Sequence, residues 1–128
     1  MLFRNLLIVN AILFLPFGIG FVFIPSTLLS LYGVNPESGT IVTAQLYGGL
    51  LIAIGLLSWL FREVADTAAQ RAIQVSFMIA FPINTIVHAL GTMSGTMNAL
   101  GWSAVIIYLL LSVGYTYFYF TTPKEQVV

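Results

Sequence analysis

Four long, largely apolar stretches, at residues 6–24, 41–61, 68–92 and 101–120, make up most of this sequence. A helix needs about 20 predominantly apolar residues to cross the hydrocarbon core of a bilayer, and each stretch is close to that length. Inside hydrocarbon, helices and closed barrels are the structures that satisfy every backbone amide and carbonyl, and these uninterrupted stretches have helical rather than alternating character. The sequence therefore predicts an all-α fold: an integral membrane four-helix bundle that forms a single domain over residues 1–128.

The composition indicates that the solvent around these helices is lipid. Only 6% of the 128 residues are charged and 59% are hydrophobic, whereas a soluble domain has about 25% charged residues. A water-facing surface cannot be built from four basic and four acidic side chains. The net charge is zero and no basic cluster is present, so we expect the lipid bilayer as a partner and no nucleic acid.

The basic residues predict an orientation. All four would lie on one side of the membrane: Arg4, Arg62, Arg71 and Lys124. By the positive-inside rule, both termini are then cytoplasmic. The short loops and the small size favour a bacterial inner membrane.

Aromatic residues predict the same orientation, because tryptophan and tyrosine gather at the two membrane–water interfaces. The expected inner belt is Trp59, Tyr115, Tyr117 and Tyr119, and the expected outer belt is Tyr32 and Trp102.

The segment from Pro25 to Gly33 is too short to cross a membrane. Proline suits a first helical position, and Leu28, Leu31 and Tyr32 would share one helical face. We expect a short helix that lies in the outer interface after the first span.

One face of each later span is expected to point into the bundle. In the third span, polar and aromatic residues recur at alternating intervals of three and four, the period of a helix–helix seam: Gln74, Phe77, Phe81, Asn84 and His88. The corresponding residues of the fourth span are Gly101, Val105, Tyr108, Ser112 and Tyr115, and those of the second are Gln45, Gly48, Ile52 and Gly55. In lipid, such polar and small residues favour contact with protein.

Four of these polar side chains form a candidate ligand-binding cluster. At about 1.5 Å of rise per residue, Gln45, Asn84, His88 and Tyr108 all fall in the outer half of the bundle. Within the spans, His88 is the one ionisable residue apart from the tyrosines and from Arg71 near the start of the third span. An ionisable group in a membrane is a functional-site hypothesis because it is costly to keep there. The alternative is structural: a neutral imidazole bonded to Gln45 or Tyr108 across helices would fix their packing.

The sequence contains no pattern of a catalytic, metal or cofactor site. Cysteine is absent, which removes thiolate metal sites and cysteine nucleophiles. The spans contain no acidic residue, and one histidine cannot supply two axial haem ligands within one chain. We therefore predict no catalytic residue, no metal ligand and no cofactor.

Short motifs in the first half of the chain resemble the DoxX-like group of small bacterial four-helix integral membrane proteins, most of them of unknown function. They are Pro25 with Tyr32-Gly33, Gln45-x-Tyr47-Gly48 with Gly55, and Trp59 with Arg62. The resemblance implies a four-helix bundle with both termini inside. Some relatives are linked to quinone-dependent oxidation as accessory subunits. This chain has no redox centre of its own, so that activity is not expected here.

Three functions agree with the sequence. The first is a bundle without its own catalytic centre that binds another membrane protein or a small apolar, lipid-like ligand. The second is a channel or transporter for a small solute, formed by self-association, with a polar track at Gln45, Asn84 and His88. The third is a quinone- or sterol-binding subunit of a membrane enzyme, in which His88 donates a hydrogen bond to the ligand beside Tyr108.

Overall fold

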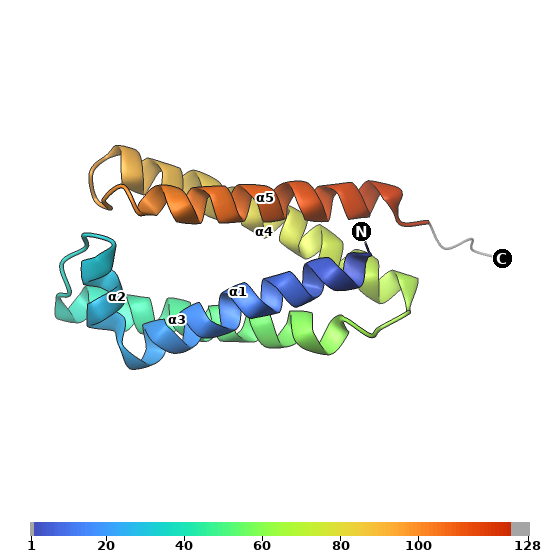
Figure 1. The fold of residues 1–128 in the computed structure, drawn as a ribbon, viewed down its shortest axis with the longest axis horizontal. Coiled ribbons are helices and arrows are strands. Elements are labelled where there is room, and N and C mark those ends of the chain that lie inside the picture. Colours follow the sequence, from blue (N-terminus) through green and yellow to red (C-terminus); the bar gives the residue numbers. More distant parts are fainter. Residues whose placement is uncertain (1, 124–128) are drawn as a thin grey trace.

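The computed structural model describes residues 2–123, and this part of the chain is all-helical, as predicted (Figure 1). The helices are α1 (Phe3–Phe23), α2 (Pro25–Leu31), α3 (Ser38–Phe61), α4 (Thr67–Met93) and α5 (Gly101–Thr121). All except α2 are long and apolar enough to cross a membrane. At about 1.5 Å per residue, their lengths are roughly 30–40 Å. Lys124, one of the four cations behind the predicted orientation, lies outside the described residues.

The helices begin and end within a few residues of the predicted spans. The largest differences are at the starts of α1 and α3, each three residues earlier than the apolar stretch. A hydropathy pattern marks where hydrocarbon begins, whereas a helix continues into the polar interface. At the start of α4, Asp66 is the N-cap and its carboxylate accepts from the Ala69 amide at 2.8 Å.

The long helices are arranged as two antiparallel pairs. Helix α1 packs mainly against α3, helix α4 packs mainly against α5, and the pairs also meet where α1 contacts α5. The first pair is close because glycines face each other: a Cβ on Gly48 would lie 2.7 Å from the Gly18 carbonyl oxygen. The pairs diverge toward the end that carries α2 (Figure 1).

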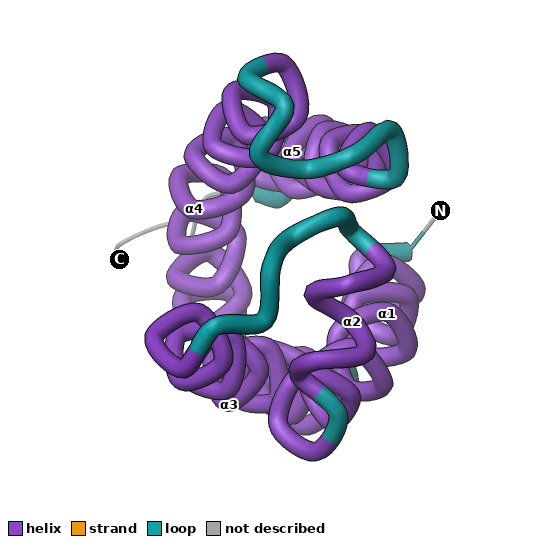
Figure 2. Tube along the Cα trace, turned by 90° about the vertical axis from the view of Figure 1, so that its left-hand side faces the viewer, coloured by secondary structure: helices purple, strands orange, loops and turns teal. Residues whose placement is uncertain are grey.

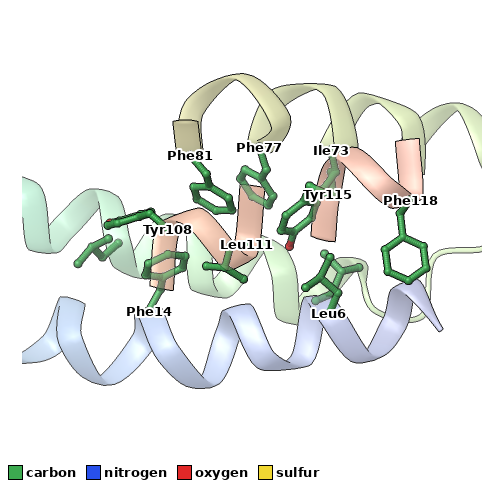
Figure 3. Packing of buried hydrophobic residues seen from close by; sticks show 11 residues of the cluster. Leu6, Phe14, Ile73, Phe77, Phe81, Tyr108, Leu111, Tyr115 and Phe118 are labelled. Carbon is green, nitrogen blue, oxygen red and sulfur yellow. The ribbon is translucent and has the colours of Figure 1, made fainter. Parts of the chain in front are cut away.

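A cluster of aromatic rings joins the two pairs in the middle of the bundle (Figure 3). Phe14 of α1 lies 5.6 Å, between ring centroids, from both Phe81 of α4 and Tyr108 of α5. Phe77 stacks on Phe81 at 4.9 Å and contacts Tyr115 edge-on at 5.0 Å. These large side chains fill the bundle from its centre toward the end opposite α2.

The ends of the bundle have different chemistry. We call the end that holds Arg4 the inner end and the end that holds α2 the outer end. At the inner end, Arg4 pairs with Glu63 at 2.9 Å. The Arg71 guanidinium lies over the Tyr119 ring, 4.5 Å from its centroid. The three described cations therefore gather at one end, since Arg62 also contacts Glu63.

Helix α2 and the segment after it lie across the outer end (Figure 2). Gly33 has a φ of +75°, in the left-handed region that glycine adopts at little cost, and so turns the chain after α2. Asn98, between α4 and α5, donates from its side chain to the Leu31 carbonyl and from its backbone to the Tyr32 carbonyl, both at 2.9 Å. This contact links the end of α2 to the other helix pair.

Candidate functional site

A cavity of about 240 Å³ lies in the outer half of the bundle, where the two helix pairs diverge. Its floor is formed by Phe14 and Tyr108 of the aromatic cluster, and Leu29 of α2 borders it on the outer side. Its lining comes from α1, α2, α3, α4, α5 and both outer loops: Leu13, Phe14, Phe17, Phe21, Leu29, Tyr32, Val34, Thr40, Thr43, Ala44, Tyr47, Leu51, His88, Met97, Ala104, Ile107 and Tyr108. The lining is mostly apolar and includes no Asp, Glu, Lys or Arg.

Three polar side chains from three helices meet at this cavity. The hydroxyls of Tyr47 on α3 and Tyr108 on α5 are hydrogen-bonded to each other at 2.5 Å. The His88 ring of α4 lies 5.0 Å from the Tyr108 ring and 6.4 Å from the Tyr47 ring, between centroids. Histidine and tyrosine thus place a small polar group within a mostly apolar cavity, whose lining also includes Tyr32, Thr40 and Thr43.

The local helix geometry explains the position of each member. Tyr108 belongs to the face of α5 that carries the buried residues Val105, Leu111 and Tyr115. Tyr47 precedes Gly48, whose contact with α1 directs this side of α3 inward. His88 lies two turns after Phe81, which is fully buried, so the same face of α4 reaches the cavity where the aromatic cluster ends.

His88 and Tyr108, predicted as part of one polar cluster, are indeed brought together. Tyr47 was not among the predicted site residues. Its place beside Gly48, in a helix expected to pack closely through glycines, was the available signal, but a tyrosine is also common on lipid-facing surfaces near an interface.

The prediction that Gln45 joins this cluster is wrong. Gln45 is exposed, and its side-chain amide donates to the Val22 carbonyl in the last turn of α1 at 3.1 Å. The buried face of α3 runs through Ala44, Gly48, Leu51, Gly55 and Ser58. Gln45 is about 100° of helical rotation past Ala44, which turns it out of the bundle and toward the end of α1.

Asn84 is near the cluster but does not line the cavity. Its side-chain amide donates to the Ala80 carbonyl one turn earlier at 3.0 Å. The backbone carbonyl of Asn84 instead bonds Nδ1 of His88 at 2.7 Å. Asn84 therefore orients the histidine through its main chain rather than presenting its own amide to a ligand.

Metal binding has no support in the described part of the chain. Residues 2–123 contain no group of three or more His, Cys, Asp or Glu side chains placed to hold a metal ion. The cavity offers hydrogen bonds and apolar contact, which can orient an uncharged molecule.

Comparison of the chain with family models, with curated proteins and with solved structures gave no match. The resemblance to the DoxX-like group therefore stays a prediction.

Proposed function

We propose that this protein is a multi-pass membrane protein that binds one small, uncharged, lipid-like molecule in the cavity between its helix pairs. The observation that carries the proposal is the combination of a mostly apolar lining with the polar group formed by Tyr47, Tyr108 and His88. Ligand sites are typically apolar concavities with a few placed polar groups that fix the orientation of the ligand.

The size of the cavity supports a ligand with a single ring or a ring-like end. A cavity of roughly 150 Å³ lined by aliphatic and aromatic residues holds benzene, and this cavity has about 240 Å³. One ring with short substituents fits that volume. Phe17 borders the cavity and is 37% exposed on the outer surface of the bundle, so a longer tail would leave past this residue into the acyl chains.

We place the cavity in the leaflet opposite the cytoplasm of a bacterial inner membrane. The support is the gathering of Arg4, Arg62 and Arg71 at the inner end, because positively charged residues favour the cytoplasmic side. The ligand would then enter from the outer leaflet.

A cavity-filling substitution tests the binding proposal. Ala104 lines the cavity, whereas Ala53 of α3 is exposed on the outside of the bundle. Native mass spectrometry of protein released directly from its membrane should show a bound molecule for the unaltered chain and for Ala53→Phe. In Ala104→Phe the same mass should be reduced at least tenfold, because the added ring fills the cavity. Equal occupancy in both variants, or no bound molecule in any, contradicts the proposal.

A polar track for a solute at Gln45, Asn84 and His88 has less support, because among the described residues Gln45 bonds the end of α1 whereas Asn84 and His88 bond within α4. A channel made by several copies stays a prediction, as does binding to another membrane protein.

A further inference from the structure

The hydrogen bonds already made around the cavity determine which polar atoms remain for a ligand. A carbonyl oxygen can only accept, so the 2.7 Å contact between His88 Nδ1 and the Asn84 carbonyl requires the hydrogen on Nδ1. No Asp or Glu lines the cavity to balance a charged ring, and an unpaired charge is very costly in apolar surroundings. In the neutral form of the ring, this Nδ1 hydrogen is donated to its own helix and Nε2 carries none.

This assignment leaves Nε2 of His88 as a hydrogen-bond acceptor. Nε2 is at the tip of the ring, farther from the helix backbone than Nδ1, and no hydrogen bond joins it to any described residue. With this tautomer His88 would accept a hydrogen bond from a ligand, whereas the third function expected from the sequence has His88 as the donor. The one N–H of the neutral ring is already donated to the Asn84 carbonyl.

The two tyrosines contribute one free donor. Each hydroxyl has one hydrogen, and the 2.5 Å bond between Tyr47 and Tyr108 uses one of the two. The remaining hydroxyl hydrogen can be donated to a ligand oxygen. Tyr47, Tyr108 and His88 together therefore offer one free hydroxyl hydrogen as a donor and, in Nε2, a nitrogen acceptor that needs a hydrogen from the ligand. The hydroxyl-bearing residues Tyr32, Thr40 and Thr43 also line the cavity but do not belong to this hydrogen-bonded group.

We propose that the ligand carries a hydroxyl head group, as an apolar alcohol or a phenol does, rather than a carbonyl or an ether. This inference rests on the proposed function and specifies the chemistry of the same site. A hydroxyl donates to His88 Nε2 and accepts from the free tyrosine hydroxyl, so both open positions are satisfied. A ketone accepts from the tyrosine but leaves Nε2 without a donor, and a buried polar atom left unpaired costs binding free energy.

Competition between two probes of the same shape tests this head-group preference. Deuterated 4-propylcyclohexanol and unlabelled 4-propylcyclohexanone, at equal concentration, are equilibrated with the purified protein in lipid nanodiscs. The two complexes are then separated by mass. We expect the alcohol to occupy the cavity about tenfold more than the ketone, and Ala104→Phe to bind neither probe.

Substitution of His88 locates the origin of the preference. Phenylalanine keeps an aromatic ring beside Tyr108 but has no acceptor, so His88→Phe should bind both probes with a ratio near one. The unfolding temperature of each variant is measured alongside, and the competition in the unaltered protein does not depend on the variant folding.

The possible outcomes separate the two proposals. Equal binding of alcohol and ketone to the unaltered protein, both lost in Ala104→Phe, overturns the head-group inference and leaves the binding cavity. Binding of neither probe, or binding that Ala104→Phe does not change, overturns both. An alcohol preference that persists in His88→Phe contradicts the assignment of Nε2 as the acceptor.

Discussion

Among the polar side chains in the inner half of the bundle, several are 0% exposed, and they include Asn10, Ser58 and Tyr115. The Asn10 amide donates to the Ser58 hydroxyl at 2.6 Å, and that hydroxyl donates to the Ile54 carbonyl at 2.8 Å. These bonds connect α1 to α3 within the apolar core. The Tyr115 hydroxyl has no hydrogen-bond partner among the described residues, and its ring packs against Phe77. We therefore expect removal of the bonded Ser58 hydroxyl and removal of the Tyr115 hydroxyl to change the stability of the protein differently.

Removal of the Tyr115 hydroxyl should leave stability unchanged or increase it. Tyr115→Phe keeps the ring contacts and deletes an unpaired polar atom, so we expect a gain of up to about 1 kcal/mol. Ser58→Ala should instead destabilise the fold by about 1–3 kcal/mol, since it leaves the Asn10 amide unpaired. Thermal unfolding of both variants in the same detergent measures the difference. A loss in Tyr115→Phe as large as that in Ser58→Ala would contradict the expectation and indicate a bonded hydroxyl.

At the residue scale, the sequence was most informative where one periodic pattern was long and regular. The five residues predicted to line the interior face of the fourth span are all buried. Tyr115 was also expected in the inner interfacial belt, and this expectation is wrong because its side chain is fully buried. Tyrosine is a side chain that favours a membrane interface, but the position of Tyr115 on the buried face of α5 determines where it lies. The prediction for Gln45 was wrong for a related reason. A polar side chain in lipid can form its hydrogen bond with the backbone of a neighbouring helix, as Gln45 does with the Val22 carbonyl.

At the scale of elements, close contact between α1 and α3 depends on which side of α3 each glycine occupies. A Cβ on Gly48 would lie 2.7–3.0 Å from atoms of Gly18, Phe21 and Val22, and two of these atoms belong to the backbone. A Cβ on the adjacent Gly49 would meet nothing within 4 Å. Substitutions of Gly48 and Gly49 therefore form a test variant and its matched control in the same helix.

Gly48→Ala should destabilise the protein, and Gly49→Ala should not. Gly48→Ala requires α1 to move away from α3, and overpacking of this kind lowers the free energy of unfolding by about 1–3 kcal/mol. The second replaces an exposed helical glycine and should be neutral or stabilising by up to about 1 kcal/mol. Chemical or thermal unfolding in detergent gives both values. Equal effects of the two substitutions would show that α1 and α3 are not in contact at Gly48.

The helices themselves were predictable because hydropathy and length dictate them in lipid. The short helix α2 also followed from Pro25 and from the apolar face of the segment. Pairing was not predictable: nothing in the hydropathy of α1 indicates whether α3 or α5 is its main neighbour. That choice depends on side-chain fit, such as the Gly18–Gly48 contact, which a single sequence does not display.

At the scale of the whole molecule, the cavity results from the divergence of two helix pairs and not from any one helix. The aromatic cluster holds the pairs together at its centre, and α2 with the outer loops spans the gap that opens beyond it (Figure 2). The sequence placed His88 and Tyr108 at similar depth, but the empty volume between the pairs depends on their relative angle. The cavity could therefore not be anticipated from the sequence.

The asymmetry between the ends of the molecule leads to a prediction about orientation. The chain contains no cysteine, so a single introduced cysteine is its sole thiol. Thr96, between α4 and α5, and Ala65, between α3 and α4, are both exposed at opposite ends of the bundle. In intact bacterial cells, a membrane-impermeant maleimide should label Thr96→Cys and not Ala65→Cys, because the cations at the inner end favour the cytoplasm. After permeabilisation both should label equally, which controls for reactivity. Labelling of Ala65→Cys in intact cells would place the inner end outside and move the ligand cavity to the cytoplasmic leaflet.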